Sequence, residues 1–192
     1  MKNDIILSGV GGQGILSIAA AIGLAAVENK LHLKQSEVHG MSQRGGDVQS
    51  HFRLSDKPVA SDLIPLGKAH LIISVEPMEA LRYLPWLSDQ GWIVTNSTPF
   101  INIPDYPPVE ELLSGIRKIQ NHIIIDAETI AREAGSVRAG NIVVLGAASP
   151  FIQIPFNSLE NSVRQLFMRK GEEIVEINIK ALRAGRKFTE SN

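Results

Sequence analysis

The sequence contains no cysteine, and this absence removes several kinds of chemistry at once. Disulfide bonds, thiolate zinc sites, iron–sulfur clusters held by cysteine and cysteine nucleophiles are all excluded. Any redox centre that this chain serves must therefore be held by another chain. The five histidines also lack the H-E-x-x-H spacing that presents two of them on one helical face, so no metal site is expected.

An excess of charge of one sign and long apolar runs are missing as well. The 19 Lys and Arg against 20 Asp and Glu give a net charge of -1, so no broad attraction to nucleic acid or to an anionic membrane is expected. No apolar run approaches the roughly 20 residues of a membrane-spanning helix, and the N-terminus lacks the pattern of a signal peptide. We therefore expect a cytoplasmic protein. Its 192 residues, 44% of them hydrophobic, predict a single domain, residues 1–192.

Short apolar runs alternate with segments of helical periodicity along the chain. The predicted strands are residues 4–10, 31–38, 47–54, 70–75, 91–96 and 122–126. The predicted helices are residues 13–27, 77–87, 129–134, 157–171 and 172–184. This order indicates an α/β fold with three layers, in which a mostly parallel, Rossmann-like sheet carries helices on both faces.

Several boundaries in this pattern depend on particular residues. Asn157 followed by Glu160 resembles a capping pair at the start of a helix, and Gly185 is expected to end the last helix. Residues 141–148 fit either a buried strand or a buried helix, with helix favoured. Four prolines predict that much of residues 97–121 forms a loop that leaves the sheet.

The first strand ends in a glycine-rich turn that fits G-x-G-x-x-G. The candidate binding residues are Gly9, Gly11, Gly12, Gln13 and Gly14. Glycines at such a turn permit positive φ and let a phosphate approach free amides at the positive end of the next helix. The alternative is a tight strand-to-helix turn that binds no ligand.

A second glycine-containing segment follows the second predicted strand. Its candidate contacts with a substrate or a partner are Glu37, His39, Gln43, Arg44, Gly45 and Gly46. Arg44 beside two glycines can present a guanidinium to a carboxylate or phosphate, or it is an ordinary solvated or ion-paired charge. His39 can titrate near neutral pH, although a single loop histidine more often bonds to the backbone. No catalytic residue is assigned.

Glu37 leaves two readings open. It lies where a dinucleotide-binding fold places the acidic residue that holds a ribose, or it pairs with Arg44. On the following strand, period-two spacing puts His51 and Arg53 on one face, either at the same cleft or towards solvent.

The two glycine segments are expected to share a cleft near the carboxyl ends of the strands, because ligands of open parallel sheets gather at the switch point. Replacement of Arg44 with Lys would keep the charge and lose bidentate geometry, at about 1 to 3 kcal/mol for a directly contacted anion.

At these two segments the sequence resembles the gamma-type domain of pyruvate and 2-oxoacid ferredoxin oxidoreductases. The opening turn, residues 9–15, is similar to that family's first signature, and residues 36–46 (SEVHGMSQRGG) resemble the indolepyruvate oxidoreductase beta subunit. Asn141, Gly146, Asn178, Ala181 and Gly185 also fall where the family pattern places them, whereas residues 97–111 match no pattern.

This resemblance implies a subunit that bears no cofactor and works within a larger enzyme. The larger alpha subunit would carry thiamine diphosphate and iron–sulfur clusters, decarboxylate aryl pyruvates to acyl-coenzyme A and pass electrons to ferredoxin. Coenzyme A is a possible ligand of the glycine-rich loop. A stand-alone NAD-dependent dehydrogenase and a purely structural assembly subunit are the alternatives.

A subunit built for a complex is expected to pair with itself in isolation or to expose an apolar surface. Trp86, Trp92 and Phe100 are the candidate anchors of such a surface, since aromatic residues are enriched at the centres of interfaces.

Overall fold

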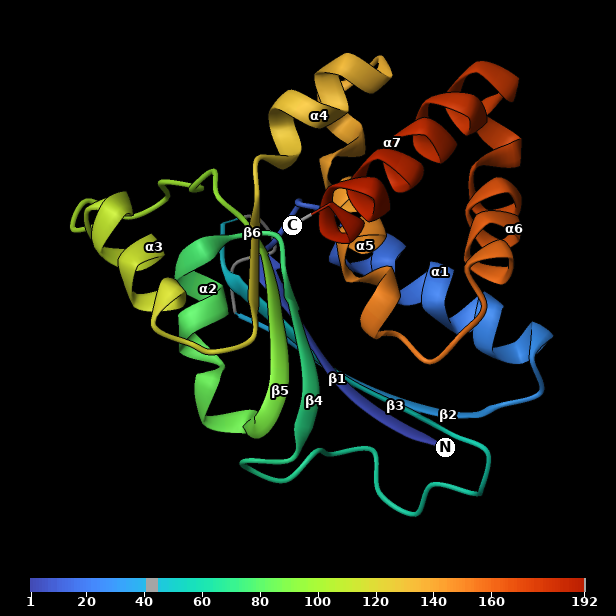
Figure 1. Ribbon diagram of the computed structural model, residues 1–192, viewed down its shortest axis with the longest axis horizontal. Helices are drawn as coiled ribbons and strands as arrows, with labels where there is room; N and C mark the ends of the chain where they lie inside the picture. Colours follow the sequence, from blue (N-terminus) through green and yellow to red (C-terminus); the bar gives the residue numbers. More distant parts are fainter. Residues whose placement is uncertain (41–44, 192) are drawn as a thin grey trace.

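A six-stranded sheet forms the middle layer of the computed structural model, which describes residues 1–40 and 45–191, the side chain of His39 excepted (Figure 1). In spatial order the strands are β2-β3-β1-β4-β5-β6. Their bounds are β1 Lys2–Val10, β2 His32–His39, β3 Asp47–Ser55, β4 Ala69–Ser74, β5 Leu87–Asn96 and β6 His122–Ile125. The strand β3 runs antiparallel to both β1 and β2, and the pairs β1–β4, β4–β5 and β5–β6 are parallel.

Helices cover both faces of the sheet. Their bounds are α1 Ile15–Glu28, α2 Pro77–Arg82, α3 Val109–Arg117, α4 Ala127–Ala134, α5 Gly140–Ala148, α6 Phe156–Phe167 and α7 Glu172–Glu190. In the described part of the chain, short 3-10 helices follow α2, α4, α5 and α6: η1 Leu84–Trp86, η2 Val137–Ala139, η3 Ser149–Phe151 and η4 Met168–Lys170. Figure 1 shows α2 and α3 on one side of the sheet and α1 with α4 to α7 on the other. The predicted three-layer α/β fold is confirmed.

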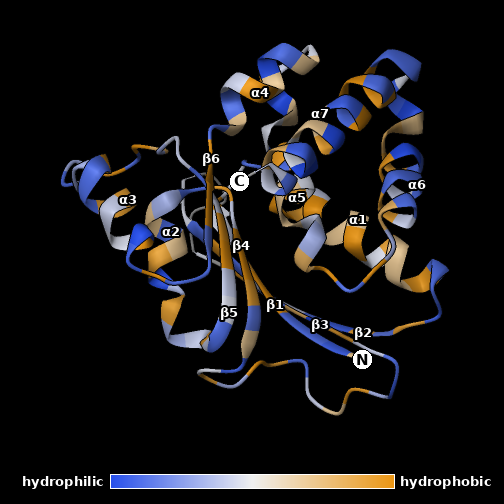
Figure 2. Cartoon of the chain, viewed as in Figure 1, coloured by the Kyte–Doolittle hydropathy of each residue, from blue (hydrophilic) through white to orange (hydrophobic). Residues whose placement is uncertain are grey.

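The central strand explains why both faces are covered. All residues of β1 after Lys2 are buried, as expected for a strand between two layers of helices. The larger apolar cluster joins β1, β4 and α5 on the face that carries α1, and the smaller one lies beneath α2 and α3. Figure 2 shows the hydrophobic residues gathered on the sheet and on α5. Within the described residues, no helix is both long and apolar enough to cross a membrane.

The predicted capping pair at the start of α6 is wrong. The helix begins at Phe156, directly after Pro155, which has φ -56. Asn157 therefore lies inside the first turn, where its side-chain oxygen accepts a hydrogen bond from the amide of Ser158. Glu160 instead pairs with Arg183 of α7. A proline with fixed φ can begin the helix without a polar cap.

The predicted end of the last helix is also wrong, because α7 continues through Gly185 to Glu190. Gly185 is buried against α5, and Thr189, beyond it, donates a hydrogen bond to the carbonyl of Ala147. The glycine serves close packing of two helices rather than termination.

Two further segments differ from expectation. The predicted helix over residues 77–87 ends at Arg82, and β5 already begins at Leu87. Pro85 explains this, because it lacks an amide and its ring would clash with the carbonyl four residues earlier. The sequence pattern also gave no sign of α3, which follows Pro108. Residues 141–148 lie in a helix, as favoured.

Candidate functional site

The two halves of the sheet diverge between β1 and β4. After β1 the chain enters α1 on one face and reaches the β2 edge, whereas after β4 it enters α2 on the opposite face and continues towards β6. Open α/β sheets bind ligands outside the carboxyl ends of strands at such a switch point. The glycine-rich turn lies at this point, because it follows β1 directly.

The turn is closed by its own glutamine. The side-chain oxygen of Gln13 accepts a hydrogen bond of 2.8 Å from the amide of Val10, and the amide of Gln13 donates to the Val10 carbonyl at 3.1 Å. Gly12 and Gly14 have φ of +100° and +83°, a region that side chains rarely adopt. The glycines are thus required by the backbone of the turn.

Asn141 of α5 fastens this turn from the far end of the sequence. Its side-chain amide donates to the carbonyl of Gly14 at 3.0 Å. An ideal Cβ on Gly14 would lie only 2.5 Å from the same nitrogen, so no larger residue fits without displacing Asn141. The start of α1 and the start of α5 therefore form one unit.

Several amides at the start of α1 are not used by the helix itself. Ser17 and Ile18 are the first helix residues whose amides bond to Gly14. Within the described residues, no hydrogen-bond acceptor is recorded for the amides of Gly12, Gly14, Ile15 and Leu16. Such amides, at the positive end of a helix dipole, favour phosphate and carboxylate groups.

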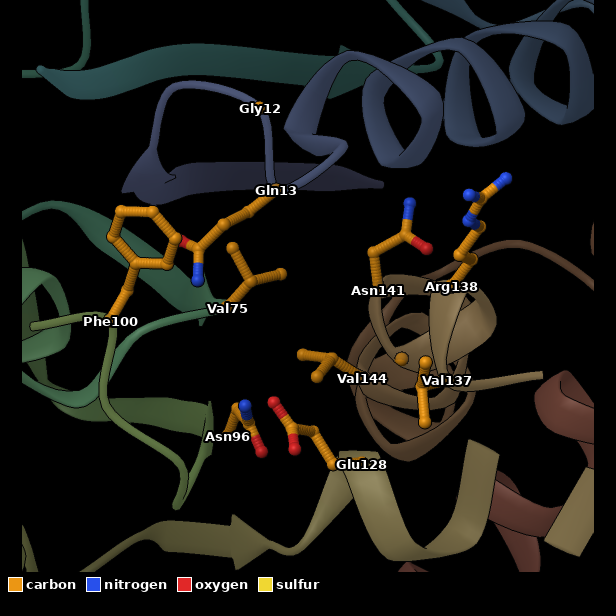
Figure 3. Close-up of a pocket in the computed structure, with 11 residues that line it drawn as sticks. Gly12, Gln13, Val75, Asn96, Phe100, Glu128, Val137, Arg138, Asn141 and Val144 are labelled. Carbon is orange, nitrogen blue, oxygen red and sulfur yellow. The ribbon is translucent and has the colours of Figure 1, made fainter. Parts of the chain in front are cut away.

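Beside the turn is a cavity of about 480 Å³. It is lined by Gly12, Gln13, Val75, Asn96, Phe100, Glu128, Val137, Arg138, Gly140, Asn141 and Val144. Figure 3 shows Asn96 and Glu128 together at one end, with the Glu128 carboxylate directed towards Asn96, while Asn141 and Arg138 lie on the wall opposite Phe100. The cleft thus combines amide donors, one cation and one carboxylate with apolar surface.

A second cavity, of about 340 Å³, also borders the turn. It is lined mainly by small or apolar residues: Val10, Gly11, Gly12, Gly14, Ile15, Leu16, Ser17 and Val48. Gly12 belongs to both cavities, so the turn borders one hollow of mixed polarity and one that is mostly apolar.

The second glycine segment meets the first at the end of β1. The amide of Gly11 donates to the carbonyl of Gly46 at 2.8 Å, and the amide of Gly45 donates to the carbonyl of Gly11 at 3.5 Å. The two segments thus lie side by side at the end of β1, but neither Gly45 nor Gly46 lines the two cavities, so the shared cleft stays a prediction. Gln43, Arg44 and the side chain of His39 lie outside the described residues.

Glu37 is separated from the turn by a whole strand. It lies on β2, and β3 intervenes between β2 and β1. Its carboxylate accepts a hydrogen bond from Gln35 at 3.2 Å. In dinucleotide-binding folds, by contrast, the ribose-binding acid is presented beside the strand that carries the glycine turn. The ribose reading of Glu37 has no support in this topology.

His51 and Arg53 are buried structural residues rather than cleft or solvent-facing ones. His51 accepts a hydrogen bond from the amide of Ile64 at 3.0 Å, and burial lowers the pKa of its imidazole. The Arg53 guanidinium forms two hydrogen bonds with the carboxylate of Asp4, which is fully buried. His51 and Arg53 do lie on one face of β3, as predicted, but that face is buried beneath residues 61–64.

The stretch from 97 to 108 supplies a wall of the cleft that sequence reasoning missed. Phe100 lines the larger cavity and is 42% exposed. Asn102 donates to the carbonyl of Gly45, which links this stretch to the second glycine segment. Trp86 and Trp92, the other predicted anchors, instead pack within the chain, against Tyr83 and Phe151 respectively.

Asn96, Glu128 and Arg138 were also missed as cleft residues. Each lies where an element begins or ends: Asn96 at the end of β5, Glu128 in the first turn of α4 and Arg138 in η2. Only Asn96 could have been recognised from the sequence as a cleft residue, because it is a polar residue at the end of a predicted strand. Among the described residues there is no group of three or more His, Cys, Asp or Glu that could hold a metal ion.

Sequence comparison matches nearly the whole chain. Residues 4–188 match the model of the family described as pyruvate ferredoxin/flavodoxin oxidoreductase. Indolepyruvate oxidoreductase subunit IorB of Archaeoglobus fulgidus is 37% identical over 96% of this chain and 94% of that protein. IorB of Pyrococcus horikoshii is 36% identical, again over 96% of this chain and 94% of that protein.

Solved structures share the fold at lower identity. Pyruvate oxidoreductase subunit PORC of Thermotoga maritima has a TM-score of 0.73 at 20% identity, over 97% of this chain and 96% of that one. The 2-oxoglutarate:ferredoxin oxidoreductase of Magnetococcus marinus, with 2-oxoglutarate, coenzyme A and succinyl-CoA bound, has a TM-score of 0.78 at 21% identity. In that case the match covers 100% of this chain and 31% of the other.

Proposed function

This chain belongs to the pyruvate ferredoxin/flavodoxin oxidoreductase family, and we propose that it is the small subunit, without a cofactor of its own, of an indolepyruvate-type 2-oxoacid ferredoxin oxidoreductase. The names and the end-to-end alignment of the IorB relatives support the indolepyruvate assignment. The lack of cysteine agrees with a redox centre held by another chain.

In this proposal a larger partner subunit carries thiamine diphosphate and the iron–sulfur clusters. The partner decarboxylates an aryl pyruvate and passes electrons to ferredoxin, and the acyl group is transferred to coenzyme A. In this proposal the present chain takes no part in the redox step and is inactive alone. Its contribution is to present the cleft to the partner's active centre.

One observation carries the assignment of the cleft to coenzyme A. The amides of Gly12, Gly14, Ile15 and Leu16 have no acceptor among the described residues, as in sites that bind phosphate, and the turn borders one hollow of mixed polarity and one that is mostly apolar. Coenzyme A carries its phosphates between an adenosine at one end and a long polar arm that ends in a thiol at the other. The phosphates suit the amides and Arg138, while the two ends suit two separate hollows. A related structure with coenzyme A bound adds support.

Exposed apolar side chains around the cleft suit a docking partner. Leu16, Phe100 and Val137 are 57%, 42% and 48% exposed, and each lines one of the two cavities. Ile101 and Ile103 continue this apolar rim at 69% and 42% exposure. We propose that the large subunit covers this rim, because exposed apolar groups that gather around a site mark a contact surface.

The test is the effect of Arg138→Ala on the assembled enzyme. We expect the KM for coenzyme A to rise about tenfold, since a charge-assisted contact with phosphate is lost, with little change in the KM for indolepyruvate. Arg132→Ala is the matched control, because Arg132 is also exposed near the cleft but does not line it. Equal coenzyme A kinetics in the two variants would contradict the assignment.

A further inference from the structure

Glu76, between β4 and α2, is a buried carboxylate with donors from two other parts of the chain. Glu76 is completely buried, with 0% of its surface exposed. One oxygen, Oε2, accepts the amide of Glu79 at 2.8 Å and so caps α2. The other, Oε1, accepts the amide of Phe100 at 3.4 Å and the hydroxyl of Tyr106. The two oxygens therefore serve two separate elements.

The choice of glutamate is informative, because shorter polar residues are the preferred helix caps. Asp or Ser in this place would satisfy the first amides of α2 but would lack the reach for a second set of donors. Burial of a carboxylate is also unfavourable unless it is well hydrogen-bonded. Glu76 has a longer side chain than a cap requires, and its second oxygen accepts donors from another segment, which fits a role beyond capping.

The hydroxyl of Tyr106 is a dependable donor to this carboxylate. Burial, and then its hydrogen bond with Glu76, raises the pKa of Tyr106 well above the ordinary value for a phenol. Phe100, Asn102 and Tyr106 together fix residues 97–108 to Glu76 and to Gly45. As a result Phe100 is held in the wall of the cleft that Gln13 also lines (Figure 3).

We propose that Glu76 is a positioning residue for the coenzyme cleft: it holds the segment 97–108 so that Phe100 forms a wall of the cleft and so sets the affinity for coenzyme A. This rests on the proposed function of the cleft. Glu76 touches neither the ligand nor the reacting atoms, and it acts through Phe100.

Two variants weaken this connection and leave the helix cap in place. Tyr106→Phe removes only the hydroxyl, and Glu76→Asp keeps the charge and the cap but shortens the reach. In the assembled enzyme we expect each to raise the KM for coenzyme A about three- to tenfold, the worth of one to two hydrogen bonds. The kcat at saturating coenzyme A and the KM for indolepyruvate should stay within about twofold of wild type.

Tyr83→Phe is the matched control. Tyr83 is buried, and its hydroxyl donates a hydrogen bond of 3.3 Å to the carboxylate of Asp47. That bond does not involve residues 97–108. This variant should leave the KM for coenzyme A unchanged. Hydrogen exchange of the isolated chain gives a second readout, in which residues 97–108 should exchange faster in Tyr106→Phe than in Tyr83→Phe.

The possible results separate this inference from the coenzyme site itself. If Arg138→Ala raises the KM for coenzyme A while Tyr106→Phe and Glu76→Asp do not, the role of Glu76 is wrong and the site stands. If none of the three variants changes that KM, the coenzyme site is wrong and this inference falls with it. Equal effects of Tyr106→Phe and Tyr83→Phe on KM would likewise overturn it.

Discussion

Replacement of Gly185 with alanine tests how closely α5 and α7 must approach. An ideal Cβ on Gly185 would lie 2.0 Å from the carbonyl oxygen of Val143 and 2.9 Å from the amide nitrogen of Ala147. The contact is reciprocal, because a Cβ on Gly146 would lie 2.0 Å from the carbonyl oxygen of Leu182. The obstacle is backbone on both sides, so no side-chain rotation can relieve it. The helices would have to move apart by about 1 Å in a close-packed interior.

The magnitude follows from two opposing effects. Overpacking of a core destabilises by about 1 to 3 kcal/mol, and a backbone obstacle places this case at or above the upper end. Alanine in a helix offsets about 1 kcal/mol of that through its higher helix propensity. We therefore expect the free energy of unfolding of Gly185→Ala to fall by about 2 kcal/mol and its Tm by about 4 to 8 °C.

The assay is urea and thermal unfolding of the isolated chain followed by circular dichroism. Gly115→Ala in α3 is the matched control, because a Cβ there would meet Leu81 at an ordinary distance of 3.5 Å. That variant should gain about 0.5 to 1 kcal/mol. If Gly185→Ala is as stable as wild type, or gains stability like the control, the close helix contact does not exist as described.

Two further predictions concern charge and the glycine turn. Burial disfavours the charged form of Asp4, but hydrogen bonds from Arg53 and Lys2 outweigh it and hold its pKa below 3.8. The stability that Asp4 contributes is therefore complete above pH 3.8 and is lost as pH falls towards the lower folded-state pKa. Acid titration of urea unfolding should show a steeper loss below that pH in wild type than in Asp4→Asn, which is itself about 3 kcal/mol less stable at neutral pH. Gly14→Ala should lose about 1 to 3 kcal/mol, since it combines a φ of +83° with a clash against Asn141, and calorimetry would measure it.

Much of the fold could be predicted from local sequence. Apolar runs and helical periodicity depend only on neighbouring residues, so the order of the strands, the helices other than α3 and the position of the glycine turn were predicted correctly. Errors arose where a residue has two structural uses. Gly185 is as suitable for close helix packing as for a helix end, and nothing local distinguishes the two.

The cleft was less predictable because long-range topology assembles it. Asn141 bonds to Gly14, 127 residues earlier, and Arg138 lines the same cleft, because the packing of α5 brings this part of the chain to the turn. The insertion of β3 between β1 and β2 is likewise absent from any local pattern, yet it decides that Glu37 lies far from the turn. Phe100 was noted for its aromatic ring, but its place in the cleft depends on Glu76, 24 residues earlier.

The central claim, that this chain is the dependent small subunit of a 2-oxoacid oxidoreductase, is tested most directly by reconstitution. The purified chain, its large partner subunit and the mixture are each assayed for ferredoxin reduction with indolepyruvate and coenzyme A. We predict no activity from the chain alone and strong activity from the mixture that depends on coenzyme A. Hydride transfer to NAD by the chain alone, or a partner subunit whose activity is unaffected by the chain, would contradict the account.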